Sequence, residues 1–261
     1  MPDTPSAVAA WLFEEHRAGR RFQVFSSRAA DASLAGAYAV QREYMRLQQH
    51  ARGAGIAGWK IGLTSPTMQA LCGIDHPVAG LVLDDRLHAS GATVRRQDFG
   101  RFGVEFEIAV RLGRDLLPIG RPFTRDDVAP VVEAVAAAME IVDDRGCDYP
   151  SLDVFSLVAD NAWNAGIVVG EWRTSWPELA QVVGVVTVDG AEVDRGRGSD
   201  VLGHPFEPLA WLANHLAAGG DALRAGQVVM TGSLVRTRFP EVPQRIRYEA
   251  VELGAVDLQL D

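Results

Sequence analysis

Hydrophobic positions repeat at helical spacing in the first part of the chain and form short strand-like runs afterwards. Over residues 5–52 the apolar positions recur every three or four residues, and Gly19 interrupts the pattern. From Gly58 onward, short apolar runs are broken by glycine. The pattern therefore predicts a helical N-terminal segment over residues 1–57 and a mixed body over residues 58–261.

The body is expected to combine short helices with short strands. Ser65 and Pro66 are typical of a helix start, and Gly73 of its end. Thr124 is expected to cap a helix that continues through an alanine-rich stretch to about Met139. The other expected elements are strands over 81–83, 102–112, 166–170, 227–230 and 245–260, a hairpin over 182–193 that turns at Asp189–Gly190, a helix ending at 158–162, and a helix along Leu209, Leu212 and Leu216. This mixture predicts the α+β class.

Composition narrows the class of protein. The 261 residues carry a formal net charge of −9, which argues against nucleic acid or an anionic membrane as a partner. The two cysteines, Cys72 and Cys147, do not make a disulfide framework and indicate a reducing compartment. The sequence shows no leader peptide and no uncharged apolar stretch of about eighteen residues. We therefore expect a cytoplasmic enzyme.

Two glutamates share one face of the strand expected over residues 102–112. Because side chains alternate along a strand, Glu105 and Glu107 point to the same side, roughly 7 Å apart. Two carboxylates in a dry site repel each other unless one is protonated or a cation lies between them. A hard divalent ion such as Mg²⁺ or Mn²⁺ would relieve the repulsion. The alternative is the solvated outer face of an antiparallel sheet, where glutamates are ordinary.

A third carboxylate, Glu140, follows the alanine-rich stretch inside an apolar run. Three carboxylates with positions left for water and substrate fit a catalytic magnesium site better than a closed structural one. Asp143 either supports such a site from outside the ligand set or pairs with Arg145. The sequence shows no histidine–cysteine spacing typical of zinc, no phosphate-binding loop and no dinucleotide fingerprint.

Lys60 is the only lysine among 25 basic residues. Its neighbours in Gly58–Gly62 are glycines and apolar residues, a setting in which a compact ammonium can be partly desolvated. Arginine cannot supply such a group, because its guanidinium is larger and always charged. We therefore place Lys60 among the catalytic residues. The alternative is a chance survivor with apolar neighbours.

Several segments resemble the 2-keto-4-pentenoate hydratase family, which belongs to the fumarylacetoacetate hydrolase superfamily and includes 2-oxohept-3-enedioate hydratases and 4-oxalocrotonate decarboxylases. The resemblance runs from about Ala37 to the C-terminus. It rests on Gly58–Ser65, Gly73–Pro77, Glu105–Glu107, Glu140–Asp143, Ala159–Ala162, Leu202–Pro205, Leu209–Asn214 and Met230–Ser233.

The resemblance implies a fumarylacetoacetate-hydrolase-like, β-rich catalytic domain (a β-roll) over residues 58–261, preceded by the helical segment. It implies that Glu105, Glu107 and Glu140 hold Mg²⁺ or Mn²⁺, and that Lys60 lies near the carboxylate and enol oxygen of the substrate. The implied substrates are short 2-hydroxy-2,4-dienoates from the meta-cleavage of aromatic compounds. The same site would serve water addition and decarboxylation, so the metal ligands do not choose between them.

Two positions depart from the family pattern. Many hydratases of the family carry aspartate where Val78 stands here, and serine where Trp163 stands. The handling of water and protons is then expected from other polar residues, with Asp75, His76, Asp160 and Asn161 as candidates. A surface loop position for His76 and a helix end for Asp160 and Asn161 are the open alternatives.

Substrate binding is assigned to Leu63, Trp163 and the segment Thr231–Gly232–Ser233. Trp163 is expected to wall the pocket and set substrate size, although a buried tryptophan is also common in a plain core. The Thr231–Gly232–Ser233 segment ends an apolar strand, where backbone NH groups and hydroxyls can bind a carboxylate. A simple strand-ending turn is the alternative there.

The sequence therefore predicts a metal-dependent hydratase that acts on a short 2-hydroxy-2,4-dienoate. Decarboxylation of a 2-oxo-enedioate at the same metal site is the first alternative. Hydrolysis of an acylpyruvate carbon–carbon bond ranks lower, because no histidine–glutamate pair for water activation is visible. A non-catalytic subunit that steadies a pathway partner is the alternative from another class. A homo-oligomer is expected, and so is the absence of nucleic-acid and membrane partners.

Overall fold

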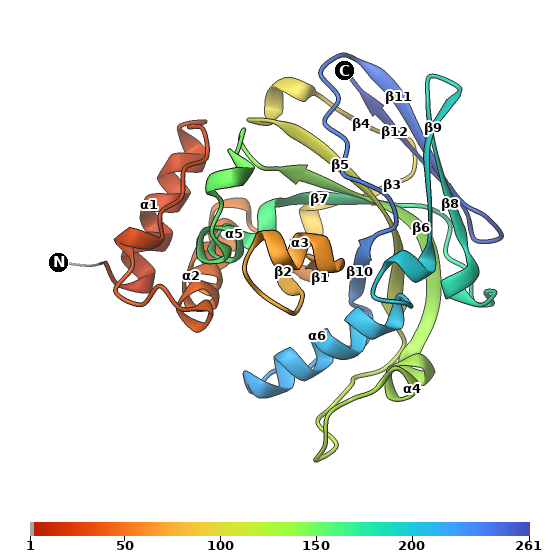
Figure 1. Cartoon of the computed structure of the whole chain (residues 1–261), viewed down its shortest axis with the longest axis horizontal. Helices are drawn as coiled ribbons and strands as arrows, with labels where there is room; N and C mark the ends of the chain where they lie inside the picture. Colours follow the sequence, from red (N-terminus) through yellow and green to blue (C-terminus); the bar gives the residue numbers. More distant parts are fainter. Residues whose placement is uncertain (1–2) are drawn as a thin grey trace.

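The computed structural model describes residues 3–261, and it consists of an N-terminal helical layer beside two sheets (Figure 1). The first helix, α1 (Pro5–Arg17), begins at Thr4, whose hydroxyl accepts a hydrogen bond from the Ala7 NH. The second, α2 (Leu34–Arg52), begins at Ser33 and ends at Gly53, which adopts a left-handed conformation. The helices predicted within residues 5–52 are therefore confirmed, with an irregular connection between them that contains a short 3₁₀ turn.

Seven strands form the larger sheet, in the spatial order β2-β1-β10-β5-β6-β7-β3. Their bounds are β1 (Ile56–Gly62), β2 (Val78–Leu83), β3 (Leu87–Ala89), β5 (Phe102–Leu112), β6 (Val132–Asp143), β7 (Asn164–Val169) and β10 (Val228–Ser233). β5 and β6 are the longest strands and pair antiparallel along almost their whole length. The strand predicted over residues 102–112 is confirmed, and those near 81–83, 166–170 and 227–230 are found with shifted ends.

The larger sheet is rolled, so that strands far apart in its order approach each other. β2, at one edge, lies beside β7 near the other edge. Asn161, which precedes β7, closes this gap with its side-chain amide: it accepts from the Leu81 NH at 2.7 Å and donates to the Leu81 carbonyl at 2.9 Å. One side-chain amide thus replaces a pair of backbone hydrogen bonds across the seam, and the β-rich roll expected from the family resemblance is present.

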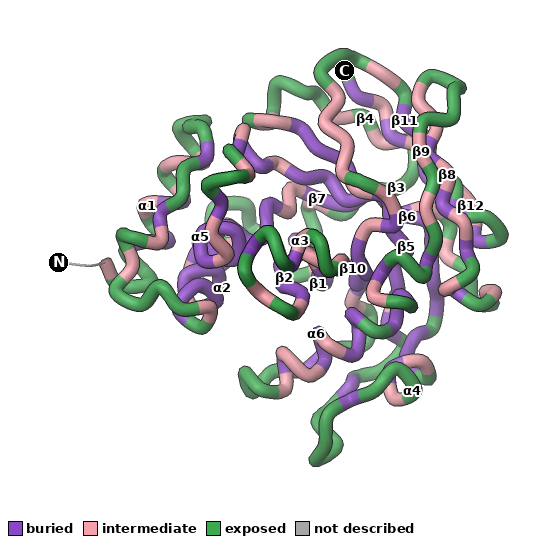
Figure 2. The backbone as a smooth tube through the Cα atoms, in the orientation of Figure 1, coloured by how far each residue is buried: buried purple, intermediate pink, exposed green. Residues whose placement is uncertain are grey.

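The smaller sheet has the order β4-β12-β11-β8-β9 and packs against β5 and β6 (Figure 1). Its strands are β4 (Ala92–Val94), β8 (Val183–Val188), β9 (Ala191–Arg197), β11 (Gln244–Ala250) and β12 (Gly254–Leu260). Phe106 of β5 meets Tyr248 of β11 at the contact between the sheets. Figure 2 shows that buried positions follow the central strands, whereas the loops at the periphery are exposed. The predicted hairpin at Asp189–Gly190 is confirmed as the β8–β9 turn.

The alanine-rich stretch is strand β6, so the helix predicted from Thr124 to about Met139 is wrong beyond its first turn. Helix α4 spans only Arg125–Val128, and β6 begins at Val132. Alanine has the highest helix propensity, but packing in the fold overrides such local preferences. Here Ala136 and Ala138 face the interior of the roll, in a buried cluster with residues of β2, β5, β7 and β10.

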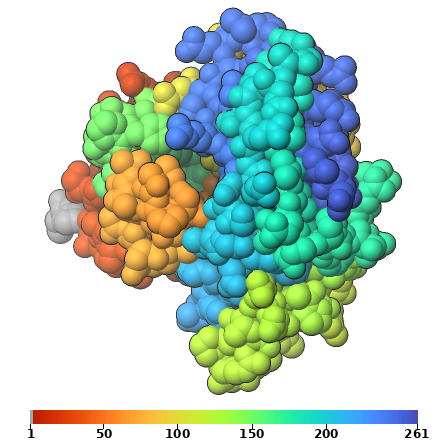
Figure 3. All heavy atoms as spheres, turned by 45° about the vertical axis from the view of Figure 1, so that its right-hand side comes forward, coloured from red at the N-terminus to blue at the C-terminus, as the bar shows by residue number. Residues whose placement is uncertain are grey.

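The remaining helices cover the ends of the roll. α3 (Pro66–Leu71) begins at Ser65, whose hydroxyl accepts from the Met68 NH, as the sequence predicts. Figure 3 shows the segment that carries α3, drawn in orange, on the surface of the molecule. α5 (Val154–Ala159) packs against α2, and α6 (Phe206–Ala218) packs against β1 and β10. None of the helices in the described chain is long and apolar enough to cross a membrane.

Candidate active site

Three glutamates meet on the inner face of the roll. Glu105 of β5 stands directly opposite Glu140 of β6 in the strand register, and Glu107 follows two positions along β5 on the same face. One oxygen from each carboxylate lies within 4.8 Å of those from the other two. Glu107 and Glu140 are fully buried, and Glu105 is partly exposed. This is the arrangement predicted for a divalent metal. Glu140, however, lies on strand β6 and does not follow a helix as predicted.

Two strand irregularities aim hydrogen-bond donors at the buried glutamates. The register between β10 and β5 shifts between Met230 and Ser233, and there the Gly232 NH donates to Glu107 Oε2 at 2.7 Å. The register between β6 and β7 also shifts near the start of β7, and the Asn164 amide donates to Glu140 Oε1 at 2.9 Å. Such bulges often re-aim groups beside active sites. Each buried glutamate therefore has one oxygen held by the protein.

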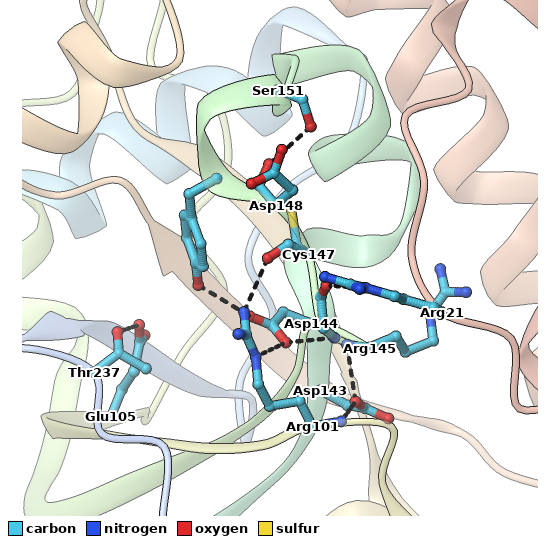
Figure 4. Close-up of polar contacts among 12 residues, drawn as sticks. Arg21, Arg101, Glu105, Asp143, Asp144, Arg145, Cys147, Asp148, Ser151 and Thr237 are labelled. Atoms are coloured by element: carbon cyan, nitrogen blue, oxygen red, sulfur yellow. Dashed lines mark hydrogen bonds and ion pairs between the residues drawn. The ribbon is translucent and has the colours of Figure 1, made fainter.

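Glu105 is held in the same way, by the Thr237 hydroxyl at 2.5 Å (Figure 4). The second oxygens of the buried pair, Glu107 Oε1 and Glu140 Oε2, have no hydrogen-bond partner among residues 3–261. A buried carboxylate oxygen without a donor is costly, and one bound to a cation is not. Carboxylates that each keep one oxygen free fit a hard divalent ion such as Mg²⁺ or Mn²⁺.

The electrostatics of the site point the same way. Burial, together with the charges of Glu140 and Glu105, holds the pKa of Glu107 well above its usual range. Burial likewise raises the pKa of Glu140 to about 7, although Lys60 opposes that shift. The protein alone does not supply enough positive charge for three ionised carboxylates. A bound divalent cation would return the glutamates to their ionised state.

Lys60 lies on β1 with its Nζ 3.2 Å from Glu140 Oε1, and its side chain is only 4% exposed. Burial lowers the pKa of Lys60, but the charges of Glu140, Glu105 and Glu107 together raise it above its ordinary value. The ammonium therefore stays protonated in this surrounding. It is a positive group beside the glutamates, where the sequence predicts one.

The wall around Lys60 is built of small or apolar residues. A Cβ added to Gly62 would lie 3.2 Å from Lys60 Nζ and 3.5 Å from a Val78 methyl group. Val78, the position where many family members carry aspartate, therefore places a methyl group instead of a carboxylate beside Gly62, two residues along β1 from the lysine. Within residues 3–261, Lys60 pairs with the carboxylate of Glu140.

The segment Thr231–Gly232–Ser233 is placed beside the glutamates. Its hydroxyls are used by the backbone, since Thr231 donates to the Ile108 carbonyl at 2.7 Å and Ser233 to the Val235 carbonyl at 2.8 Å. Its Gly232 NH supports Glu107, as described above. The loop that contains Leu63 crosses this segment, and Leu63 itself has a left-handed backbone conformation. Thr64 packs so closely on Gly232 that a Cβ there would lie 2.3 Å from its hydroxyl. The predicted role of Leu63 and of the strand end in substrate binding stays a prediction.

Trp163 stands beside Asn164 and is buried. Its ring contacts those of Phe22 and Tyr149, with centroids 5.3 and 5.9 Å away. Together with Asn161 and Asn164 it lines a cavity of about 950 Å³ whose other walls include residues of α1 and α2. Trp163 is therefore a wall residue of a cavity adjoining Asn164. Its assignment to substrate binding stays a prediction.

Of the four residues suggested for proton handling, Asp75, His76 and Asp160 lie in different places. Asp160 is buried and paired with Arg145 and His16, at 2.5 and 2.6 Å. The His76 Nδ1–H donates a hydrogen bond to the Pro77 carbonyl at 2.7 Å, and the ring stacks on Trp211 of α6, with centroids 6.0 Å apart. Asp75 is exposed. None of these contacts joins them to the glutamates, and their catalytic roles stay predictions.

With this geometry established, comparisons with known proteins identify the family. The sequence profile described as "Fumarylacetoacetate (FAA) hydrolase C-terminal" matches residues 74–259. The chain belongs to the fumarylacetoacetate hydrolase family. It is 34% identical over 227 residues to the 2-hydroxyhexa-2,4-dienoate hydratase of Comamonas testosteroni, covering 85% of this chain and 84% of that protein. It is 33% identical to the 2-oxo-hept-4-ene-1,7-dioate hydratase of Escherichia coli, covering 89% of each.

Among solved structures of the family, the chain resembles the 4-oxalocrotonate decarboxylase from Pseudomonas putida G7 in complex with magnesium and adipate. The TM-score is 0.90 at 28% identity, over 98% of this chain and 97% of that one. The relatives make this fumarylacetoacetate hydrolase family member an enzyme of the hydratase and decarboxylase type. The family resemblance found in the sequence is confirmed.

Sequence reasoning missed the groups that support the three glutamates. Asn164 gave no signal, because an asparagine before an apolar run is ordinary in a turn. Thr237 lies far from Glu105 in sequence and meets it only because the chain after β10 returns along β5. The Gly232 NH could have been foreseen as a donor, since glycine at a strand end is typical of a bulge.

Proposed function

We propose that this enzyme is a Mg²⁺- or Mn²⁺-dependent hydratase that adds water to a short 2-hydroxy-2,4-dienoate. The observation that carries the proposal is the buried group of Glu105, Glu107 and Glu140, with unpartnered oxygens and a single ammonium beside it. The names of the curated relatives supply the substrate class. Aromatic meta-cleavage products are the natural source of such dienoates.

The glutamates, their hydrogen-bond donors and Lys60 each have a separate role in the proposed reaction. When bound, the divalent cation would act as a Lewis acid toward the carboxylate and 2-oxygen of the substrate. Gly232 NH, Asn164 and Thr237 fix the orientation of the three glutamates. Lys60 adds positive charge where the 2-hydroxyl becomes a ketone, and it can hold or pass the proton that moves during that step. Water then adds to the conjugated ketone.

Three basic side chains near the site are already paired: Lys60 with Glu140, Arg145 with Asp160, and Arg101 with Asp144, as Figure 4 shows for Arg101. A dicarboxylate would bring a second negative charge that needs a free cation, because an unpaired buried charge is costly. Arg236 and Arg238 flank Thr237, the residue that bonds Glu105, and form no ion pair within residues 3–261. The charges around the site therefore admit both a dienoate with a neutral tail and an enedioate.

The test is a direct assay. Purified protein is mixed with Mg²⁺ and 2-hydroxypenta-2,4-dienoate, and loss of the diene absorbance is followed together with formation of the hydrated 2-oxo acid. Turnover that needs the metal and disappears in Glu107→Gln supports the proposal. A chain that binds the metal but leaves the diene unchanged over a range of tail lengths contradicts it.

Decarboxylation of a 2-oxo-enedioate is the second candidate, favoured by Val78. A hydratase needs a group that handles the added water, and the methyl groups of Val78 stand where many relatives carry a carboxylate. Decarboxylation has no such need. Release of CO₂ from 4-oxalocrotonate without a hydrated product would favour the decarboxylase. Acylpyruvate hydrolysis, a non-catalytic role, a homo-oligomer, a pathway partner and a cytoplasmic location stay predictions.

A further inference from the structure

A strained turn leads into the strand that supports Glu140. Asn161, Ala162 and Trp163 all have positive φ values, of 52°, 46° and 61°, and none of them is glycine. Residues other than glycine in this region each cost on the order of 1 kcal/mol or more and persist only where the surroundings hold them. Three such residues in succession therefore need contacts that hold them in place. We call these contacts anchors; one is made by Asp160, just before the turn, and one by Asn161, its first residue.

The first anchor is an ion-pair network at Asp160. Its carboxylate is 2% exposed, and both of its oxygens are engaged. Arg145 Nη2 lies 2.5 Å from Oδ2, and His16 Nε2 lies 2.6 Å from Oδ1. The arginine and the histidine hold the pKa of Asp160 below its ordinary value, although burial opposes that shift. The carboxylate is therefore an ionised, fully bonded fixed point.

The second anchor is Asn161, whose side chain bonds both backbone groups of Leu81 across the seam of the roll. The turn ends at Asn164, whose amide donates to Glu140 Oε1. The five consecutive residues Asp160–Asn164 thus connect a buried ion pair, a bridge to β2 and a proposed metal ligand. A shift of the turn would move the donor that holds Glu140.

We propose that Asp160 is a positioning residue. With Arg145 and with His16 of α1 it holds the left-handed turn that aims Asn164 at Glu140. Through His16, helix α1 near the N-terminus thereby contributes to the proposed metal site, whose residues follow much later in the sequence. This inference rests on the proposed metal site but not on the identity of the substrate or the reaction, and Asp160 acts through Asn164 without touching the reacting atoms.

The alternative is that the Asp160 network only stabilises the packing of α1. The two cases differ in what the removal of His16 changes. His16 is the suitable probe because its side chain is 25% exposed, so that His16→Ala leaves a solvated gap and keeps the Arg145–Asp160 pair. Asp160→Asn would leave Arg145 buried without a counter-charge and is at risk of unfolding.

The experiment is titration of the metal-free, full-length protein with Mn²⁺ by calorimetry, together with kinetics of the Mg²⁺-loaded enzyme. Loss of an outer partner of a metal ligand typically weakens metal binding by about 10- to 100-fold. We expect Asn164→Ala to fall in that range and His16→Ala to weaken Mn²⁺ binding by about 5-fold, below that range because it acts one step further away. His16→Gln, whose amide can still donate to Asp160, should restore most of the affinity.

Arg17→Ala is the matched control, since Arg17 lies on the same helix and makes only an exposed pair with Glu14.

A double-mutant cycle decides whether His16 acts on the metal site through Asn164. In the Asn164→Ala background, His16→Ala should have no further effect on Mn²⁺ affinity. Effects that simply add, or a His16→Ala variant that melts earlier yet binds Mn²⁺ like the wild type, would overturn the inference. Metal affinity is independent of the substrate, so a failed hydratase assay does not affect this result.

Discussion

Two clusters of buried charge lie close together in this enzyme, and they differ in how their charges are balanced. In the first, three glutamates surround one lysine, and two carboxylate oxygens lack a partner. In the second, Asp160 stands between Arg145 and His16, and both of its oxygens are bonded. Burial is nearly complete for the carboxylates Glu107, Glu140 and Asp160 alike.

The direction of the pKa shift separates the clusters. The pKa of Glu107 and that of Glu140 are raised, mainly by burial, whereas neighbouring bases lower the pKa of Asp160 in spite of burial. A buried acid with its counter-charges present is part of the scaffold. Buried acids that outnumber the positive groups around them indicate a binding site for a cation. The comparison therefore assigns chemistry to the first cluster and positioning to the second.

The largest expected effect comes from removing an acid from the unbalanced cluster. Glu107→Gln keeps the shape of the side chain and the bond from the Gly232 NH, but it removes a metal ligand. Because a catalytic divalent cation supplies several kcal/mol of transition-state stabilisation, the proposed role predicts a fall in kcat/KM of about 10³-fold or more. The metal-free variant should be more stable than the metal-free wild type, since one repelling charge is gone.

Steady-state kinetics and thermal melting in EDTA measure both effects of Glu107→Gln. Asp115→Asn, an exposed carboxylate paired with Arg224, is the control and should behave like the wild type. A Glu107→Gln protein that turns over substrate normally would remove the distinction between the clusters.

Lys60→Met is expected to have the next largest effect. The substitution removes the ammonium but keeps an apolar stem of similar length. General acid–base and electrostatic contributions of this kind are worth about 10²- to 10⁴-fold in rate. Lys60→Arg should fail to restore activity, because a planar guanidinium that is always charged does not replace a compact ammonium that can release its proton. Measured kcat should fall, while Mn²⁺ binding by calorimetry persists. An active Lys60→Arg enzyme would contradict the assigned role.

The pH dependence of stability should differ between the clusters. The pKa of Glu140 is raised from 4.5 to about 7, so the native state keeps a proton that the unfolded state has lost. Stability of the metal-free protein therefore falls as pH rises from about 5 to 7, by a few kcal/mol at most. The pKa of Asp160 is lowered from 3.8, so its contribution is full above that value and is lost only in more acidic solution.

Urea denaturation at several pH values, in EDTA and in Mg²⁺, measures this difference. The decline above pH 5 should appear in EDTA, disappear with Mg²⁺ and be reduced in Glu140→Gln. A decline of equal size with and without the metal would show that it does not arise from the glutamates.

The sequence predicts the local elements of the fold well where composition and packing agree. The capped helix at Ser65, the β8–β9 hairpin and the strand with Glu105 and Glu107 follow from turn chemistry and alternation. The prediction is wrong for β6, because alanine has a high helix propensity. In the fold these alanines face the interior of the roll and pack against other strands. That packing depends on strands distant in sequence, so no local pattern reveals it.

The candidate site divides in the same way. Glu105, Glu107, Glu140 and Lys60 are found from their chemistry and from the family resemblance, because acids and a lone lysine in apolar segments are unusual. Asn164, Thr237 and His16 are ordinary residues in ordinary segments. They become significant only where bulges, a strained turn and helix packing bring them to a carboxylate, and those contacts arise from the tertiary fold.

The smallest expected effect concerns a buried polar group that lacks a partner and yet lies outside both clusters. The Tyr248 hydroxyl is fully buried and unbonded, and the ring packs on Phe106, which faces away from Glu105 and Glu107. Tyr248→Phe removes an unsatisfied hydroxyl, so stability should stay the same or rise by up to about 1 kcal/mol. Mn²⁺ affinity and kcat should not change, because the charge balance of the glutamates is untouched. Urea denaturation and calorimetry test both statements. A loss of metal affinity in Tyr248→Phe would mean that the unbalanced cluster extends through β5 to the second sheet, and that charge balance alone does not define the site.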